Sequence, residues 1–431
     1  MAEVRTLETE STPQQTVKSA EEIDGADLVV GILADLGQYA VAGLCDDLRG
    51  LPGNPRVVVL QNVPQNALQN HAASASAAGS DSSAQNSSLF LLPWTLHGQS
   101  LPTTPFESVT AAFSSIFALS ERLGARGCCL LASHLEYAPS KWICRLTEPL
   151  LDKSSDFVAP RYALRKFEGL LNHSIISPLT RSLYGKRIQN PMGPDFAISQ
   201  QLFQTLWGAE GRNGERTAGG MNLLASLLPR AVCSDLQVCQ AYLGARTYPP
   251  VDWTAVSSLL TQVLGPVFLA MERSAACWQK TRASTPIRTL NQPLPVPQPA
   301  GSVEVARLVN SFQLGVRDLQ EIWGLVLPPA ILLELRKLSR LPAEQHHFPD
   351  DLWVRIVYDF ALAHRLRTIN RDHLLASLTP LYLGWVASYA REMENSEVTA
   401  AEQRLERLAL AYEAEKPYLV SRWRWPDRFN P

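Results

Sequence analysis

Short apolar runs separated by amphipathic stretches dominate the first part of the chain. Continuous apolar runs of this kind are typical of strands buried on both faces of a parallel sheet. Stretches with helical periodicity separate several of the runs, and this alternation predicts parallel βαβ units and an α/β fold. The expected strands are 26–33, 56–61, 88–92, 127–132, 157–159 (ended by Pro160) and 236–243, and the expected helices are 39–48, 106–123 and 139–151.

The last part of the chain has the 3.6-residue period of helices instead. One apolar stripe consists of Trp353, Ile356, Val357, Phe360 and Ala361, and 374–389 is strongly apolar. Such stripes face a core shared with neighbouring helices. The pattern therefore predicts an α-helical C-terminal domain at 301–431.

Stretches of biased composition divide the chain. Residues 1–26 are polar and predict a disordered tail, and the Ala- and Ser-rich residues 64–87 predict a flexible insertion. The Pro-rich residues 284–300 are typical of a linker. The α/β domain is accordingly expected at 27–283.

Composition and charge exclude several classes of function. The chain has 431 residues and a formal net charge of -2, so no overall basic field favours nucleic acid. No apolar stretch is long enough for a membrane span, and the first 26 residues lack the apolar core of a signal peptide. Seven cysteines without a CxxC pair predict reduced thiols, and we expect a cytoplasmic protein.

The stretch 156–202 holds most of the candidate chemistry. A strand end leads into a basic, aromatic segment, and a helix from Pro178 to Tyr184 follows, which Gly185 ends. A Pro/Gly turn then leads to Asp195, before a helix expected at 196–207. Asp195 is open to two interpretations, as the cap or first residue of that helix or as a carboxylate in a ligand site. Ligand sites of open α/β sheets lie beyond the carboxyl ends of strands, which suits the second.

The same stretch resembles the acceptor-side segment of GT-A glycosyltransferases of the mannosylglycerate synthase and glucosyl-3-phosphoglycerate synthase type, a family 2-like group. The helices at 351–389 resemble the C-terminal extension of that group. The resemblance implies a GT-A-like (Rossmann-like) mixed sheet flanked by helices and followed by an α-helical domain. The matching residues are Asp156, Val158, Pro160, Tyr162, Pro178, Leu179, Leu183, Tyr184, Gly185, Pro191, Gly193, Asp195 and Phe196.

The resemblance also implies roles for individual residues. Asp195 is the candidate catalytic carboxylate. The candidate substrate-binding residues are Arg161, Tyr162, Arg165, Lys166 and Arg246, the last because its permanent positive charge attracts phosphate. From their residue types alone, Arg161, Arg165 and Lys166 form either an anion-binding cluster or the solvated face of a loop.

The metal-binding positions of the group are not matched. The group binds a divalent ion with a D-x-D after a central strand and with a later histidine, since hard cations need such donors beside a diphosphate. Here Ser133, His134 and Glu136 occupy the first place and Tyr248 the second. We expect no metal cofactor, and Mg²⁺ or Mn²⁺ only if His134 and Glu136 form a site.

Two functions follow from this. The first is transfer of a sugar from a nucleotide-sugar donor to a small anionic acceptor such as a glycerate. The alternative is a catalytically inactive glycosyltransferase-like binding or scaffold protein, because the D-x-D, the metal histidine and the donor lysine of the group are absent. The expected partners are the nucleotide sugar and the acceptor, without nucleic acid or a membrane span, and a homodimer is left open.

Three smaller expectations concern the C-terminal domain. His364 completes the Trp353 stripe and is expected to be a packing residue. His346 and His347 stand in a polar loop and are expected to face solvent. Trp423 and Trp425 are expected to dock the C-terminal tail onto the helices, with a lipid or RNA contact as the alternative.

Overall fold

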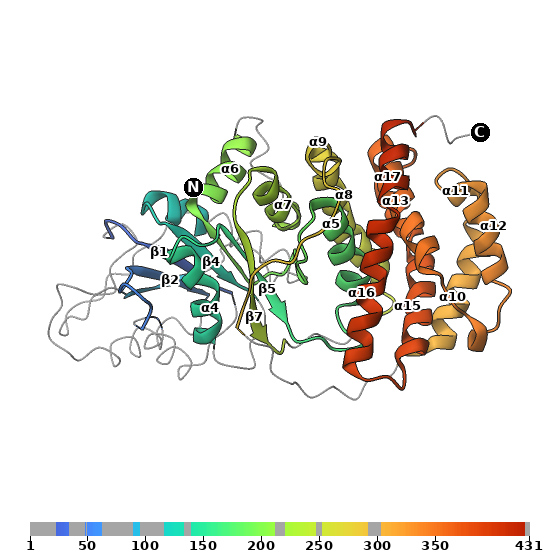
Figure 1. Cartoon of the computed structure of the whole chain (residues 1–431), viewed down its shortest axis with the longest axis horizontal. Coiled ribbons are helices and arrows are strands. Elements are labelled where there is room, and N and C mark those ends of the chain that lie inside the picture. Colours follow the sequence, from blue (N-terminus) through green and yellow to red (C-terminus); the bar gives the residue numbers. More distant parts are fainter. Residues whose placement is uncertain are drawn as a thin grey trace. The chain divides into compact units, whose positions relative to one another are not determined.

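The computed structural model describes residues 23–33, 48, 50–62, 89–94, 116–132, 139–211, 220–246, 252–291 and 303–426 (Figure 1). These residues form two compact units. The sheet unit comprises the described residues of Met1–Tyr162, Met192–Thr247 and Arg288–Pro293. The helical unit comprises those of Ala163–Pro191, Tyr248–Ile287 and Leu294–Pro431. The domain boundaries expected from composition remain predictions.

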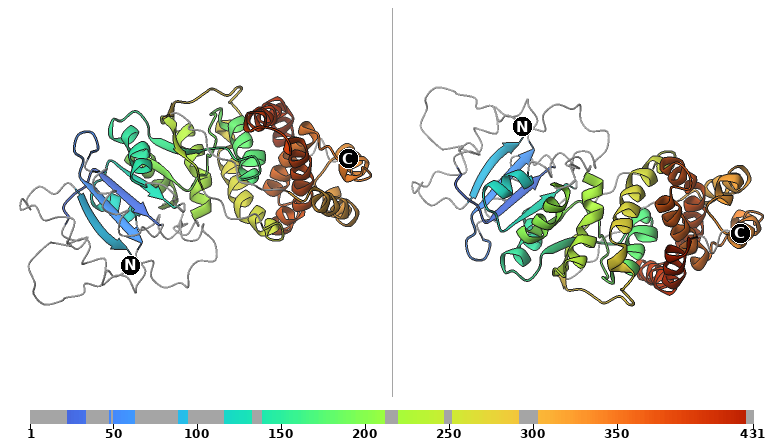
Figure 2. Two further views of the ribbon diagram at one scale, coloured as in Figure 1. Left: turned by 90° about the horizontal axis from the view of Figure 1, so that it is seen from below. Right: turned by 90° about the horizontal axis from the view of Figure 1, so that it is seen from above.

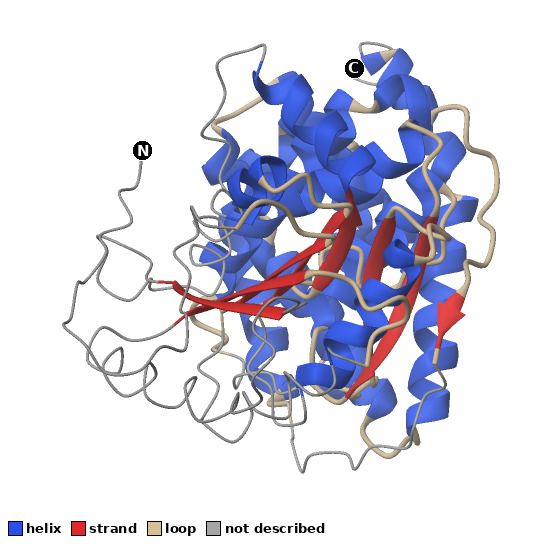
Figure 3. Ribbon diagram, turned by 90° about the vertical axis from the view of Figure 1, so that its left-hand side faces the viewer, coloured by secondary structure: helices blue, strands red, loops and turns tan. Residues whose placement is uncertain are grey.

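The sheet unit is built on one mixed sheet, whose strands are red in Figure 3. Among the described residues it has eight strands in the order β3-β2-β1-β4-β6-β5-β7-β8. Neighbouring strands are parallel except β6, which runs antiparallel to β4 and β5. The strands are β1 (Leu28–Ile32), β2 (Val57–Asn62), β3 (Leu89–Trp94), β4 (Gly127–Leu131), β5 (Phe157–Tyr162), β6 (Phe196–Ser199), β7 (Val238–Gly244) and β8 (Thr289–Leu290).

Helices cover both faces of this sheet (Figure 2). On one face, Trp142, Ile143 and Leu146 of α4 (Pro139–Leu151) pack into an aliphatic core formed by the strands. On the other face, a side chain on Gly31 of β1 would collide with Ile116 at 2.0 Å, so the helical residues 116–122 lie directly on that strand. The expected mixed sheet flanked by helices is confirmed. The unit also contains α6 (Gln200–Gly211) and α7 (Gly220–Cys233).

Two local predictions in this unit are wrong. Pro160 does not end β5 but pairs with Ala241 of β7. β5 pairs with β6 only through Phe157 and Val158. At Pro160 the side of β5 that faces away from β7 has no partner strand, so the absence of an N–H on proline costs no hydrogen bond there.

The second error concerns the residues after Asp195. Residues 196–199 form β6 rather than the start of a helix, and α6 begins only at Gln200. This short apolar run fills the place between β4 and β5, where Ala197 is opposite both Cys129 and Val158. Asp195 therefore precedes a strand, and its interpretation as a helix cap is wrong.

The helical unit has an aromatic core. Trp353 of α13 (Asp350–Leu366) stacks on Trp385 of α15 (Thr379–Met393) with ring centroids 6.0 Å apart, and the predicted Trp353 stripe is buried. The helices are α5 (Ser177–Tyr184), α8 (Val256–Arg273), α9 (Ala275–Trp278), α10 (Val305–Asp318), α11 (Gln320–Gly324), α12 (Pro329–Leu338), α13 (Asp350–Leu366), α14 (Arg371–Ser377), α15 (Thr379–Met393), α16 (Val398–Ala414) and α17 (Lys416–Arg424), with a 3₁₀ turn η3 (Ala343–Gln345). The expected helical C-terminal region is confirmed.

A π-helical turn, η2 (Asn172–Ile176), leads directly into α5. Its Ser174 carbonyl accepts hydrogen bonds from Trp353 Nε1 at 3.1 Å and from the Tyr412 hydroxyl at 2.9 Å. Gly185 ends α5 as predicted, with a left-handed φ of 67°. The turn and helix are thus held by side chains from α13 and α16.

The histidine and tryptophan predictions have mixed outcomes. His364 is buried against Phe268, with ring centroids 5.7 Å apart, as predicted. His346 is wrongly predicted to face solvent, because its ring packs on Phe312 and its Nε2 bonds the Gly384 carbonyl at 2.9 Å. Trp423 is buried but Trp425 is 60% exposed. No helix in the described part of the chain is long and apolar enough to cross a membrane.

Candidate functional site

Asp195 lies where three strands meet at the carboxyl edge of the sheet. Because β6 is antiparallel to its neighbours, it begins at the edge where β4 and β5 end. The Ala132 N–H, just after β4, donates to Asp195 Oδ1 at 2.8 Å. The Tyr162 hydroxyl, at the end of β5, donates to Oδ2. The Asp195 side chain is 0% exposed, so both oxygens are bound inside the protein.

Two other aspartates of the unit tie strands together at the opposite edge. Asp27, before β1, accepts from the Arg56 N–H at 2.8 Å. Asp156, before β5, accepts from the Ser199 hydroxyl at 2.8 Å and from the Gln237 N–H at 3.0 Å. Asp195 differs in its complete burial, in its phenol partner and in its position on the ligand-binding edge of a parallel sheet.

Tyr162 is held in place by several contacts. The pairing of β5 with β7 shifts register between Arg161 and Tyr162, so that Tyr162 is opposite Gly244. Irregularities of this kind re-aim side chains at strand ends. The Tyr162 ring lies 6.1 Å from the Trp142 ring, and the Arg246 guanidinium is 5.2 Å from its centroid. We call Asp195, Tyr162 and Arg246 the strand-edge cluster.

The buried thiol next to the cluster is inert. Burial raises the pKa of Cys129 well above its ordinary value, and Cys128 and the Asp195 carboxylate raise it further. A neutral thiol is neither a nucleophile nor a metal ligand at neutral pH. Among the described residues of this edge, the candidate chemistry therefore lies in the carboxylate, the phenol and the guanidinium.

The remaining predicted binding residues are distributed over both units. Arg161 is half-buried on β5 of the sheet unit. Arg165 and Lys166 belong to the helical unit, where Arg165 pairs with Glu168 at 3.4 Å. Lys166 Nζ donates to the carbonyls of Met393, Glu394 and Ser396 at 3.2, 3.4 and 2.8 Å. The Lys166 ammonium, which has three N–H donors, therefore has three backbone carbonyl oxygens within hydrogen-bond distance.

The positions aligned with the metal ligands of the resembled group lie outside the described residues. They are Ser133, His134, Glu136 and Tyr248. Within the ranges that the structure describes, no three His, Cys, Asp or Glu side chains are grouped so that they could hold a metal ion. The metal expectation therefore stays a prediction.

All members of the strand-edge cluster are predicted from the sequence, but the contacts that join them are not. Tyr162 and Asp195 are 33 residues apart, and Ala132 contributes only its backbone. Nor does the sequence predict Arg145 of α4, which donates to the Tyr242 carbonyl of β7 at 2.9 Å. Only the strand order brings these groups together, and no local motif encodes that order.

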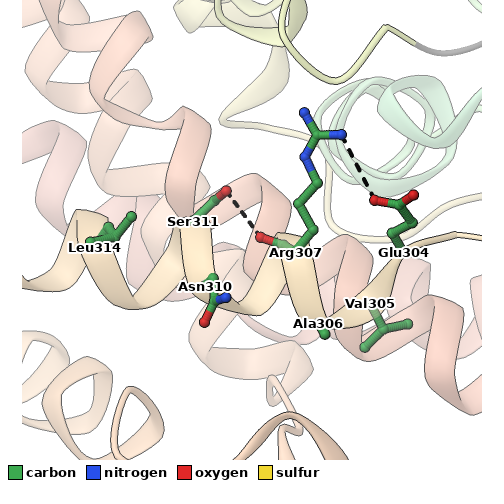
Figure 4. A pocket seen from close by; sticks show the side chains of 7 residues that line it. All are labelled: Glu304, Val305, Ala306, Arg307, Asn310, Ser311 and Leu314. Atoms are coloured by element: carbon green, nitrogen blue, oxygen red, sulfur yellow. Dashed lines mark hydrogen bonds and ion pairs between the residues drawn. The ribbon is translucent and has the colours of Figure 1, made fainter.

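A shallow pocket lies on the helical unit at the start of α10 (Figure 4). Its walls come from that helix and the residue before it, and Arg307 pairs there with Glu304 at 3.8 Å. One helix face can surround a small ligand on only one side. The lining residues are Glu304, Val305, Ala306, Arg307, Asn310, Ser311 and Leu314.

Comparison with known proteins gives weak matches. No family model matches the chain, and no curated protein matches it. A solved structure of glucosyl-3-phosphoglycerate synthase from Mycobacterium tuberculosis with Mn²⁺, UDP and glucosyl-3-phosphoglycerate is similar at 16% identity, over 62% of this chain and 87% of that one, with a TM-score of 0.36. The same enzyme with Mn²⁺, UDP-glucose and phosphoglyceric acid matches at 16% identity, 66% and 96% coverage and a TM-score of 0.37.

A further mycobacterial protein is similar at 19% identity, over 60% of this chain and 80% of that one, with a TM-score of 0.37. The named enzyme is one of the glycosyltransferases that the stretch 156–202 resembles. At these TM-scores the likeness decides nothing about function, which depends on the chain's own residues.

Proposed function

We propose that this chain is a GT-A-type glycosyltransferase, which binds a nucleotide sugar at the carboxyl edge of its sheet and transfers the sugar to a small anionic acceptor such as a glycerate. The strand-edge cluster carries the proposal. It places a carboxylate and a guanidinium at the edge where open α/β sheets bind ligands. The resemblance of residues 156–196 to the acceptor-side segment of such enzymes supports it independently.

The residues suit the charges of that reaction. Sugar transfer breaks the bond to a diphosphate, which leaves with its negative charge. Arg246 offers a permanent positive charge and a planar set of N–H donors that fits phosphate oxygens. Arg161, on the neighbouring strand end, would add a second cation. Asp195 would accept the proton of the acceptor hydroxyl, provided that the acceptor replaces Tyr162 at its oxygen.

A second candidate function is binding without transfer. The observation that favours it is the complete burial of Asp195, whose oxygens already accept from Ala132 and Tyr162. A carboxylate held in this way serves structure rather than proton transfer. The protein would then bind a nucleotide sugar as a sensor or scaffold and leave it unchanged.

The experiment is a transfer assay on the full chain. UDP-, GDP- and ADP-glucose are each incubated with glycerate or 3-phosphoglycerate, with and without Mn²⁺, and products are identified by mass spectrometry. We expect one donor and acceptor pair to give product. Asp195→Asn should abolish it, whereas Asp27→Asn, which removes a carboxylate from the opposite edge, should retain it. If calorimetry shows that a nucleotide sugar binds but no product forms, the second candidate is supported. If no nucleotide sugar binds and no product forms, both candidates are contradicted.

A further inference from the structure

The three members of the strand-edge cluster form a continuous line of contacts. The buried Asp195 carboxylate binds the Tyr162 hydroxyl, and the Arg246 guanidinium lies against the Tyr162 ring. The ring is also held by the backbone pairing with Gly244 and by the neighbouring Trp142 ring. Tyr162 is 2% exposed, whereas Arg246 is half-buried. The fixed part of the line is inside the protein, and its cationic end is at the sheet edge.

The Arg246 guanidinium is 5.2 Å from the centroid of the Tyr162 ring, within the range of a cation–π contact. A guanidinium that stacks by its flat face on an aromatic ring keeps its N–H groups at the rim of the plane, where they can bind an anion. A phenol that donates to a carboxylate carries more negative charge on its oxygen and ring, which strengthens the attraction for a cation above it. While the Tyr162 hydroxyl donates to it, Asp195 thereby acts on Arg246 through Tyr162, and this holds before any acceptor replaces that hydroxyl.

We propose that Tyr162 is a positioning residue, which couples the buried Asp195 to Arg246 and so aligns the guanidinium for the phosphates of the ligand. The ligand class, a nucleoside diphosphate sugar, rests on the proposed function. The positioning role itself requires only a ligand with a diphosphate group. Inorganic pyrophosphate is therefore a probe that separates the two claims.

The experiment measures affinities of the full chain by calorimetry for UDP-glucose, pyrophosphate and uridine. Tyr162→Phe removes only the hydroxyl. We expect it to weaken the binding of UDP-glucose and pyrophosphate by a similar factor, about tenfold, and to leave uridine unchanged. Tyr242→Phe, at another buried tyrosine of the same sheet, is the matched control and should bind all three like the wild type.

A double-mutant cycle tests the coupling itself. Arg246→Lys keeps the charge but loses the planar group that stacks on the ring. If Tyr162 acts through Arg246, the double variant Tyr162→Phe/Arg246→Lys should bind pyrophosphate no more weakly than Arg246→Lys alone. If the two substitutions weaken pyrophosphate binding by factors that multiply in the double variant, the proposal is overturned. The effects of substitutions at residues that act as a unit are not additive.

The outcomes also separate the positioning role from the proposed function. If pyrophosphate binds in a Tyr162-dependent manner but no nucleotide sugar binds, the positioning role stands and the proposed function fails. If UDP-glucose binds equally to the wild type and Tyr162→Phe, the positioning role fails and the function stands. If Tyr162→Phe loses affinity equally for all three ligands and has a lowered melting temperature, Tyr162 has only a structural role. If the wild type does not bind pyrophosphate, the positioning role is overturned.

Discussion

The two units of this protein bury polar groups in different ways. In the described part of the sheet unit, the interior between strands and α4 is aliphatic, and the fully buried carboxylate Asp195 lies at the sheet edge. The helical unit buries charges throughout, including Arg181, Arg404, Lys416 and Asp359. Buried charges contribute to structure only when they are paired, so the helical unit depends on specific partners. The sheet unit depends mainly on apolar burial.

The largest effect should come from breaking a buried ion pair of the helical unit. Arg404, 4% exposed, donates to both Asp350 oxygens at 2.8 Å and to Glu392 at 2.5 Å. Arg404→Met leaves Asp350 without its cation and Glu392 with Arg407 alone, and it should lower the free energy of unfolding by about 3–5 kcal/mol. Denaturant titration followed by tryptophan fluorescence measures this.

Arg407→Met is the matched control. Arg407 pairs with the same Glu392 at 3.0 Å but is 64% exposed, so its loss should cost about 0–1 kcal/mol. If both variants lose the same free energy of unfolding, burial does not make the Arg404 pairs stronger than the Arg407 pair. The helical unit would then not depend on its buried charges in the way described above.

Acid should destabilise the helical unit through His173 and His364, against the opposite contribution of Asp359, whose pKa is raised by burial to about 7. Burial lowers the pKa of His173 and of His364 to about 4 from the ordinary 6.5. The unfolded chain therefore binds protons first as pH falls, and stability drops between pH 6.5 and 4 by about 1.4 kcal/mol per pH unit for each such group. His364→Gln should reduce the slope of stability against pH by the contribution of one proton.

The control for acid sensitivity is His373→Gln, because His373 is exposed on α14. The free energy of unfolding of His373→Gln should depend on pH in the same way as that of the wild type. Denaturation midpoints measured at half-unit steps from pH 7 to pH 4 give the slopes. A His364→Gln curve parallel to that of the wild type would mean that the ring is protonated in the folded state.

A smaller loss is expected at the sheet edge. Asp195→Ala leaves the Ala132 N–H and the Tyr162 hydroxyl buried without their acceptor, which should cost about 1–3 kcal/mol. Asp27→Ala, at a partly exposed position, should cost about 1 kcal/mol or less. Hydrogen exchange at the Ala132 amide gives the local answer, and unchanged protection in Asp195→Ala would refute this hydrogen bond.

The smallest effect is expected from a chelator. Arg246 carries a fixed positive charge near the end of β7, and a cation next to it would be repelled. We therefore predict that nucleotide binding is weak and changes less than about twofold after EDTA treatment. Calorimetry with a nucleotide sugar and Mn²⁺, before and after chelation, checks this. Tight binding that EDTA abolishes would show that His134 and Glu136 hold a metal.

The sequence predicts the strands well where burial on both faces makes them uniformly apolar, as in 26–33 and 127–132. It fails where two patterns overlap. Residues 196–199 run into the helical pattern of α6 without a break, so strand and helix cannot be separated by periodicity. Pro160 is tolerated only because β6 leaves that side of β5 open, which depends on strand order.

The candidate site shows the same limit. Asp195, Tyr162 and Arg246 could each be named from composition and resemblance, but their contacts depend on the order β4-β6-β5-β7. His346 is similar, since its burial depends on Gly384 and Phe312. Such long-range partners decide whether a polar residue faces water, and a single sequence does not reveal them.

The number of residues in the π-helical turn Asn172–Ile176 determines which side chains of α5 face α16. A π turn holds one residue more than the α-helical turn it replaces. Each residue of an α-helix turns the next by about 100°, so an ordinary turn would rotate all of α5 by that angle. Arg181, which pairs with Glu406 and Glu413 of α16 at 2.6 Å, would then point elsewhere. One residue of extra length therefore selects which face α5 presents to α16.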